Sequence, residues 1–226
     1  MEYSRIIDNI ARIREQIPDG VKIEAAAKTR SAEECKAAIE GGIDFLGYNY
    51  VQEGLAVAAE MTEAYGPETT DSVQFSLIGH LQKNKINKAV SLFSMIETVD
   101  SLKKASQINS RVPSGKPVDV LIQVNIGSEE SKSGASFGKI REIAEGIEAL
   151  EHVALRGLMT IEPYEEDPEE SRKYFSAMKK LYDQLRDSFG EGICYLSMGM
   201  SHSWPVAVEE GASIIRVGTG IFGPRV

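Results

Sequence analysis

The sequence is 226 residues long, with a net charge of −9 at pH 7 and an isoelectric point near 5.0. This length suits one domain with a sizeable core, and the acidic balance argues against a protein that binds nucleic-acid phosphates, because such proteins usually carry a basic face. The two cysteines, Cys35 and Cys194, are too few for a disulfide framework or a thiolate metal site, so we expect a protein of the reducing cytoplasm.

The first predicted element is an amphipathic helix at the N-terminus, where charged and apolar residues alternate from Met1 to Ile10. Neither this segment nor a later one has the ~18–20 consecutive apolar residues that are needed to span a bilayer. We therefore expect no membrane association.

Eight short runs rich in β-branched and apolar residues follow the N-terminal segment, and apolar residues at helical spacing lie between them. The predicted strands are Val21 to Ala27, Ile43 to Leu46, Val73 to Ile78, Met95 to Val99, Val118 to Val124, Val153 to Ile161, Ile193 to Met198 and Ile214 to Val217. Alternation of strand and helix predicts parallel pairing. Eight repeats after one leading helix favour a single (β/α)8 TIM barrel domain over residues 1–226, rather than an open doubly wound sheet.

Lys28 stands where the first predicted strand ends, between the apolar run Ile23 to Ala27 and the helical pattern that begins at Ser31. Ligand-binding and catalytic groups of a TIM barrel lie at the C-terminal ends of its strands. A wall of alanines disfavours the ammonium form, and Schiff-base chemistry needs a neutral amine. Lys28 is therefore a candidate Schiff-base former, and a surface lysine at a strand end is the alternative.

Polar residues and glycines follow other predicted strands on the same face. Asn49 comes after the second strand and His80 after the third, while glycines gather after the last two strands, in Ser197 to Ser201 and Gly218 to Gly223. Loops after strands seven and eight of such barrels often bind phosphate through backbone N–H groups, although tight turns also require glycine. The histidines show no zinc-site spacing, so we predict no structural metal.

Six segments together carry a family resemblance. They are Ala27 to Arg30, Gly47 to Glu53, Ile78 to Lys85, Arg156 to Thr160, Leu196 to Ser201 and Arg216 to Gly223. In this order and spacing they resemble the pyridoxal phosphate homeostasis protein family, whose fold is similar to the N-terminal barrel of alanine racemase (fold type III). The match spans nearly the whole chain.

The resemblance implies that the chain binds pyridoxal 5'-phosphate, with Lys28 forming the internal aldimine. Ser197, Gly218 and Thr219 match positions expected to bind the cofactor phosphate, where hydroxyls and backbone donors meet a dianion. Met198, beside Ser197, is included among the expected cofactor contacts.

Three further positions are expected near the cofactor ring. Arg216 matches the position that faces the pyridine nitrogen, and a permanently charged guanidinium would keep this nitrogen unprotonated. That weakens the electron sink of the cofactor and favours holding the cofactor over using it. Asn49 and His80 match positions near the ring, with buried structural hydrogen bonding as an equal alternative for both.

The chain departs from the family pattern at two positions. Tyr48 replaces the acid of a usual Gly-Glu-Asn, and Ser203 replaces the aspartate of a usual Ser-x-Asp. Ser203 retains the ability to cap the helix that begins near Trp204, whereas Tyr48 adds a phenol to what we expect to be a cofactor-side loop. Ordinary drift is one explanation of the two changes. Redesign of the pocket, with Tyr48, His202 or Ser203 as new acid-base or nucleophilic groups, is the alternative.

Three functions therefore compete. The family resemblance implies a carrier without turnover, acting in intracellular pyridoxal phosphate homeostasis, with apoenzymes that depend on pyridoxal phosphate as candidate recipients and a monomer as the expected state. The second function is a pyridoxal phosphate enzyme such as an amino-acid racemase, for which no second proton-transfer group can be assigned. The third is a cofactor-free lyase of the aldolase type, in which Lys28 attacks a substrate carbonyl. We rank the carrier first.

Overall fold

The architecture is a closed barrel of eight parallel strands, and the strands are hydrogen-bonded in the order in which they occur along the chain. The computed structural model describes residues 3–113, 115, 117–127 and 133–224. The strands are β1 (Lys22–Ala26), β2 (Phe45–Tyr48), β3 (Gln74–Leu77), β4 (Met95–Val99), β5 (Val118–Val124), β6 (Val153–Thr160), β7 (Tyr195–Ser197) and β8 (Ile214–Val217). The barrel predicted from the sequence is confirmed.

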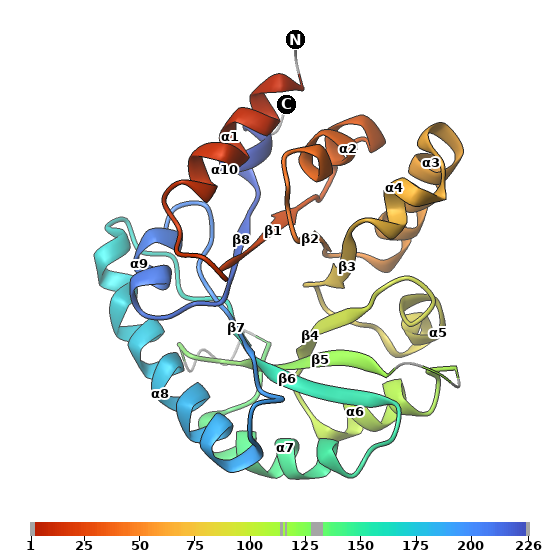
Figure 1. Ribbon diagram of the computed structural model, residues 1–226. Helices are drawn as coiled ribbons and strands as arrows, with labels where there is room; N and C mark the ends of the chain where they lie inside the picture. Colours follow the sequence, from red (N-terminus) through yellow and green to blue (C-terminus); the bar gives the residue numbers. More distant parts are fainter. Residues whose placement is uncertain (1–2, 114, 116, 128–132, 225–226) are drawn as a thin grey trace.

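Helices connect the strands and surround the barrel (Figure 1). The α-helices are α1 (Ser4–Arg14), α2 (Ala32–Glu40), α3 (Val51–Tyr65), α4 (Pro67–Asp71), α5 (Ile86–Ala89), α6 (Leu102–Asn109), α7 (Ile140–Glu148), α8 (Arg172–Phe189), α9 (Trp204–Glu209) and α10 (Thr219–Phe222). The 3-10 helices are η1 (Lys83–Lys85), η2 (Phe137–Lys139) and η3 (Pro168–Ser171). The predicted N-terminal helix is present from Ser4, and residues 1–2 lie outside the described part of the chain.

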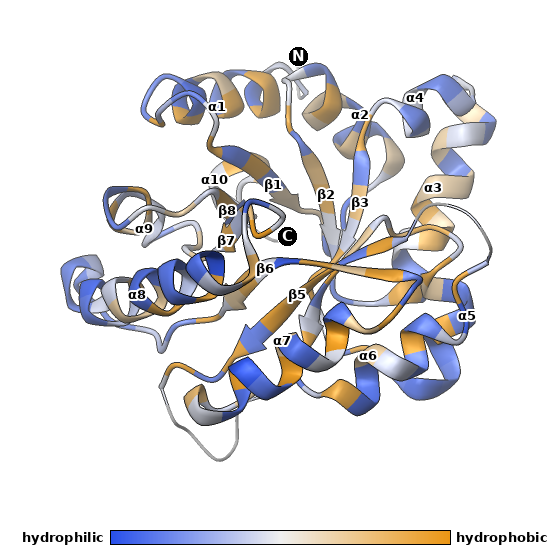
Figure 2. Cartoon of the chain, turned by 60° about the horizontal axis from the view of Figure 1, so that its bottom comes forward, coloured by the Kyte–Doolittle hydropathy of each residue, from blue (hydrophilic) through white to orange (hydrophobic). Residues whose placement is uncertain are grey.

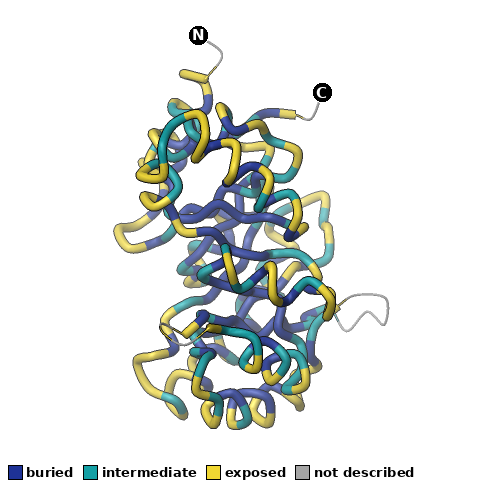
Figure 3. Tube along the Cα trace, turned by 90° about the vertical axis from the view of Figure 1, so that its right-hand side faces the viewer, coloured by how far each residue is buried: buried dark blue, intermediate teal, exposed yellow. Residues whose placement is uncertain are grey.

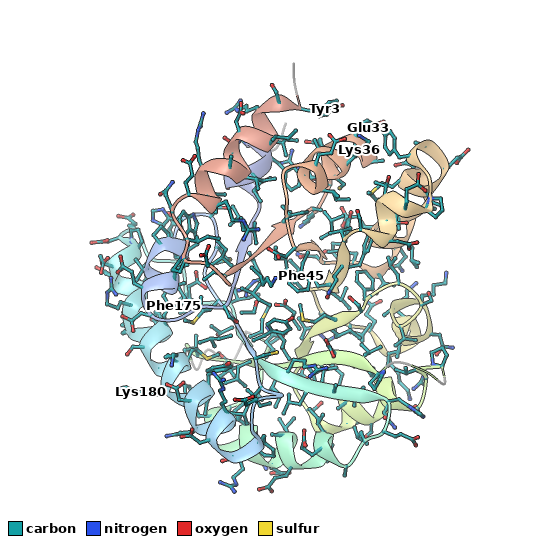
Figure 4. The ribbon with its side chains drawn as sticks, viewed as in Figure 1. Tyr3, Glu33, Lys36, Phe45, Phe175 and Lys180 are labelled. Carbon is teal, nitrogen blue, oxygen red and sulfur yellow. The ribbon has the colours of Figure 1, made fainter. Side chains whose placement is uncertain are left out.

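Each long helix packs one apolar stripe against the barrel, as its sequence pattern predicts. In α8, Phe175 and Met178 are fully buried, whereas Lys180 points outward (Figure 4). The hydropathy colouring of α7 and α8 shows the same division between the two helix faces (Figure 2). Burial of these stripes is the main contribution of the helices to the stability of the fold.

The barrel interior contains an apolar layer with a polar layer above it. The apolar layer consists of Phe45, Met95, Leu121, Met159 and Ile214, with Tyr195 packed against it. Phe45 lies near the middle of the ribbon view, and the strands form the buried centre of the molecule (Figures 3 and 4). The polar layer contains Glu24, Ser76, Glu97, Ser197 and Arg216, all of them buried.

The second strand begins two residues later than its predicted start, at Phe45 rather than Ile43, and it includes Tyr48. The Asp44 carboxylate accepts hydrogen bonds from the Ile23 N–H and the Lys22 ammonium, which fixes the turn before the strand. Tyr48 is consequently a strand residue, paired with Leu77 of β3, and does not belong to the loop that follows.

The first and last described helices, α1 and α10, lie side by side (Figure 1). The Asn9 side-chain amide donates to the Ile221 carbonyl oxygen at 2.9 Å and joins the two helices. Among the helices that the structure describes, none is long and apolar enough to cross a membrane.

Candidate functional site

Lys28 lies at the corner of a tight turn that leads from β1 to α2. The Arg30 N–H donates to the Ala27 carbonyl oxygen at 3.1 Å, which closes the turn around Lys28 and Thr29. Lys28 is half-buried, and its Nζ lies 5.8 Å from the centre of the Tyr50 ring. An aromatic face at this distance attracts a cation, so the amine is held against Tyr50 at the mouth of the barrel.

Two backbone N–H groups converge on one hydroxyl at the end of β8. The N–H groups of Gly218 and Gly220 donate to the Ser201 Oγ at 3.1 and 3.3 Å. Backbone donors that converge in this way are a common means of binding an anion. The two N–H groups are close to Lys28 along β1, because a Cβ added to Gly218 would lie 3.5 Å from the Ala26 carbonyl oxygen.

Thr219 and Met198 differ in their exposure. Thr219 is exposed at the first position of α10, directly after Gly218. Met198 is fully buried in the main hydrophobic core, and its N–H donates to the Ile214 carbonyl oxygen at 3.1 Å. Thr219 therefore lies beside the convergent N–H groups, whereas the Met198 side chain is used for packing.

Arg216 and Ser197 belong to the polar layer beneath the mouth. The Arg216 guanidinium donates to the Ser197 Oγ at 2.5 Å and to the Thr160 carbonyl oxygen at 2.6 Å. The Ser197 hydroxyl in turn donates to the Glu97 carboxylate at 2.7 Å. Ser197, expected at the phosphate, is thus engaged by Arg216 and Glu97 inside the barrel, and Ser201 is the hydroxyl at the convergent N–H groups.

Two acids of the polar layer lie close to Arg216. Burial raises the pKa of Glu97, although Arg216 and the Ser197 hydrogen bond oppose the shift. Burial, reinforced by the nearby Glu97, raises the pKa of Glu24 well above its ordinary value, while the Ser76 hydroxyl donates to Glu24 and opposes the shift. One guanidinium therefore serves two buried acids, and this arrangement favours retention of a proton on Glu24.

Asn49 and His80 line the rest of the mouth. Both contribute to two adjoining cavities of about 200 and 370 Å³ above β2–β6. Gly79 allows the close approach of these two segments, because a Cβ there would lie 2.1 Å from the Asn49 carbonyl oxygen. Asn49 is half-buried and His80 is exposed, so buried structural hydrogen bonding does not describe His80.

Tyr48 does not face the site, and the expectation that it adds a phenol to the cofactor pocket is wrong. The residue is fully buried on the outer side of the barrel, where its ring stacks on Phe75 and its hydroxyl lies 3.4 Å from the Cys35 Sγ. Strand alternation explains this orientation, since the preceding Gly47 faces Glu24 inside the barrel. Burial raises the pKa of the Tyr48 phenol and raises that of the Cys35 thiol to about 12.

Ser203 is also a buried residue whose side chain makes contacts within the protein. It occupies the N-cap position of α9 but does not cap the helix through its side chain. The hydroxyl donates instead to the Glu162 carboxylate and accepts the Met200 N–H at 3.0 Å. A carboxylate therefore lies beside position 203, supplied by Glu162, which is 3% exposed.

His202 is the exposed member of the three residues that we considered as new catalytic groups. Its ring stacks on Tyr164, and its Nε2 lies 3.0 Å from the Glu166 carbonyl oxygen. These contacts hold the ring at the surface, beside the loop between β6 and η3.

Several residues of this region were not identified from the sequence as site residues. Ser201 ends the glycine-rich turn that begins at Ser197, and a hydroxyl at this place in the sequence indicates a candidate contact with a phosphate. The buried acids Glu24 and Glu97 each occur inside an apolar strand pattern, where a charged residue indicates a partner inside the barrel. Glu162 had no comparable signal. Its partner, Ser203, is 41 positions away in the sequence.

Comparison of the sequence with known families gives one match over the full length. The family described as "Alanine racemase, N-terminal domain" matches residues 1–226. The pyridoxal phosphate homeostasis protein of Aquifex aeolicus is 35% identical over 226 residues, which cover 98% of this chain and 96% of the relative. The protein of the same name from Vibrio alginolyticus is 37% identical over 98% of both chains.

Solved structures agree with these sequence matches. The structure of PipY from Synechococcus elongatus with pyridoxal phosphate bound superposes with a TM-score of 0.85 at 32% identity, covering 96% of this chain and 100% of PipY. Alanine racemase from Corynebacterium glutamicum superposes with a TM-score of 0.76 at 12% identity, covering 99% of this chain and 61% of the racemase. At that identity the racemase shows the shared fold alone.

Proposed function

The chain belongs to the pyridoxal phosphate homeostasis protein family, and from this premise we propose that it binds pyridoxal 5'-phosphate through Lys28 and holds it as a carrier. The observation that carries the proposal is the juxtaposition of an amine and the convergent N–H groups of Gly218 and Gly220. Lys28 follows Ala26 by two residues, and Gly218 approaches Ala26 from β8. A phosphorylated aldehyde has the two groups that this pair would bind.

Gly218, Gly220 and Thr219 fit the phosphate end of the cofactor, together with the Ser201 hydroxyl. Ser201 occupies the place between the two N–H groups. We therefore assign it the phosphate contact that the family pattern had suggested for Ser197. Hydrogen bonds to a dianion are stronger than those between neutral groups, so each donor contributes to affinity.

Arg216 and Asn49 are proposed near the ring of the cofactor, and His80 at its rim. The cofactor supplies an electron sink when it is bound, and that sink needs a protonated pyridine nitrogen. Arg216 cannot supply this proton, because a guanidinium stays charged in proteins. The hydrogen bonds to Ser197 and to the Thr160 carbonyl oxygen anchor the guanidinium in place. Pairing of the pyridine nitrogen with Arg216 would favour storage of the cofactor over carbanion chemistry.

The positions of the substituted residues support the carrier over a redesigned amine catalyst. Tyr48 lies behind the barrel wall, and the Ser203 hydroxyl is bound to Glu162. Neither side chain is available to exchange protons with a substrate at Lys28. The two substitutions therefore add no acid-base group beside the Lys28 amine.

We also propose a cellular compartment, an oligomeric state and recipients of the cofactor. Cys35 is a buried free thiol and Cys194 an exposed one, which suits a reducing cytoplasm. A monomer is the proposed state, with pyridoxal phosphate-dependent apoenzymes as recipients of the cofactor. Sedimentation at several concentrations tests the first point. Recovery of activity by an apoenzyme that is mixed with the loaded protein tests the second.

The binding experiment uses the purified chain with added pyridoxal phosphate. We expect an absorbance band of a lysine imine that Lys28→Ala abolishes, and borohydride should fix the label on the peptide that contains Lys28. Lys180→Ala, at an exposed position of α8, is the matched control and should leave the band unchanged. Absence of the band, or a label elsewhere, would overturn the proposal. Loss of optical rotation from an added L-amino acid would show turnover and exclude a pure carrier.

A further inference from the structure

The residue after Lys28 has an unfavourable backbone conformation. Thr29 has a φ of +63° and is the only residue other than glycine with positive φ among those that the structure describes. A β-branched side chain is a poor fit for this region of conformational space, which glycine or asparagine usually occupies. Thr29 is the third residue of the turn closed by Ala27 and Arg30, so its φ determines how Lys28 is presented.

Both ends of this turn are anchored. On the β1 side, the Ala27 N–H donates to the Gly47 carbonyl oxygen at 2.9 Å. On the α2 side, the Arg30 guanidinium binds Glu34 and the Gly223 carbonyl oxygen, each at 3.0 Å. The anchors fix where the turn begins and ends, but they do not hold the peptide between Lys28 and Thr29.

Two hydrogen bonds act on that peptide: the Thr29 hydroxyl donates to the Lys28 carbonyl oxygen at 2.7 Å, and Glu53 binds the N–H group. The Thr29 N–H donates to the Glu53 Oε1, and the other carboxylate oxygen, Oε2, is buried and has no hydrogen-bond partner within the described residues. Glu53 is in the first turn of α3, three residues after Tyr50, whose ring faces the Lys28 ammonium. The start of α3 thus contacts the turn at two consecutive residues, through Tyr50 at Lys28 and through Glu53 at Thr29.

The geometry points to Glu53 as a positioning residue: we propose that its carboxylate stabilises the positive-φ conformation of Thr29 and thereby holds the Lys28 amine in the orientation that captures the aldehyde. The inference rests on the proposed function of Lys28. A charged acceptor forms a stronger hydrogen bond than a neutral one, which suits a conformation that would otherwise relax. Backbone strain that is retained at a functional residue has to be stabilised by its surroundings.

The test compares Glu53→Ala, Glu53→Gln, Thr29→Gly and the double variant Glu53→Ala/Thr29→Gly with the unaltered protein. The rate and the affinity of the Lys28-dependent band with pyridoxal phosphate should fall about tenfold in Glu53→Ala, as expected for loss of a charge-assisted hydrogen bond. Glu53→Gln retains an acceptor oxygen and should recover most of the loss. Glycine adopts positive φ freely, so the double variant should bind like Thr29→Gly alone.

Two controls separate positioning from general damage. Glu60→Ala removes an exposed acid of the same helix and should leave the band and the thermal midpoint unchanged. The Thr29 amide, followed by hydrogen exchange without cofactor, should exchange faster in Glu53→Ala and stay protected in Glu53→Gln. This readout examines the turn itself, independently of whether the cofactor binds.

The outcomes are distinct. If the unaltered protein forms no Lys28-dependent band, the proposed function fails, and the exchange of the Thr29 amide alone decides whether Glu53 holds the turn. If the band forms and Glu53→Ala binds pyridoxal phosphate as fast and as tightly as the unaltered protein, the inference is overturned. It is also overturned if neither the glutamine nor the glycine variant recovers binding.

Discussion

The Tyr48 hydroxyl lies 3.4 Å from the Cys35 sulfur in the layer between the barrel and its helices, on the far side of the wall from Lys28. Both groups are buried, and burial is the largest cause of the raised pKa of each. The tyrosine is consequently a core residue of this chain, although it replaces an acid of the family pattern.

Tyr48→Glu is expected to destabilise the protein without improving cofactor binding. The new carboxylate would be buried next to the Phe75 ring and the Cys35 thiol, away from water. We expect a loss of about 3–5 kcal/mol in the free energy of unfolding, measured by denaturant titration. Tyr48→Phe, the control, retains the ring and should stay within about 1 kcal/mol. Tighter pyridoxal phosphate binding by Tyr48→Glu would contradict the buried position.

Ser203→Asp should be destabilising for a related reason. It would place a second acid against Glu162, which is buried and already accepts the Ser203 hydrogen bond. We expect a cost of about 1–3 kcal/mol, with most of it recovered in Ser203→Asp/Glu162→Gln, since the amide removes the like charge. A double-mutant cycle of unfolding free energies measures this coupling. Additive single effects would show that the two side chains do not interact.

Glu24 predicts a pH dependence of stability. Its pKa is raised in the folded state, so its contribution to stability is fully present below the pKa of the unfolded chain and is lost as the pH rises through the folded value. Glu24→Gln should therefore be more stable than the unaltered protein at neutral and alkaline pH. Its thermal midpoint should rise by about 2–4 °C for each kcal/mol gained in the free energy of unfolding. The advantage should vanish at low pH. Part of the slope should persist through Glu97, whose pKa is also raised.

Ser201→Ala and Ser197→Ala distinguish the two hydroxyls near the end of β7. The Ser201 hydroxyl accepts hydrogen bonds from two backbone N–H groups at the mouth. The Ser197 hydroxyl is hydrogen-bonded to Glu97 and Arg216 below the mouth. We expect Ser201→Ala to weaken pyridoxal phosphate binding about tenfold with little change in unfolding free energy. Ser197→Ala should lower the unfolding free energy by about 1–3 kcal/mol. Titration with pyridoxal, which lacks the phosphate, should show no difference between Ser201→Ala and the unaltered protein.

The elements of the barrel were predictable because strand and helix periodicities are local properties of the sequence. The predicted runs Met95 to Val99, Val118 to Val124 and Ile214 to Val217 agree with β4, β5 and β8 at both ends. The second strand begins two residues later than predicted, since the Asp44 carboxylate before it binds the start of the neighbouring β1. A side-chain contact of this kind has no periodic signal.

The assignment of residues around the cofactor was predictable only in part. Lys28, Gly218 and Thr219 were identified from their places at strand ends, and the structure brings the Lys28 turn and Gly218 to the same mouth. Their contacts with a cofactor remain predictions. Ser201 was passed over for Ser197, because neither sequence position reveals which hydroxyl meets the N–H groups of Gly218 and Gly220.

The sequence by itself determined the eight repeats, the strand ends on which the candidate site is built, and the lysine at the first of them, because hydrophobic periodicity and chain order are sufficient for these features. The tertiary structure alone decided which side of the barrel wall each side chain occupies. Neighbouring residues of a strand point to opposite faces of the barrel wall: Gly47 faces Glu24 inside the barrel, whereas Tyr48 contacts Cys35 outside it. It also decided that Glu53 meets Thr29 and that Glu97, Ser197 and Arg216 form one buried cluster, since these contacts join residues of separate repeats and exist only after the barrel closes.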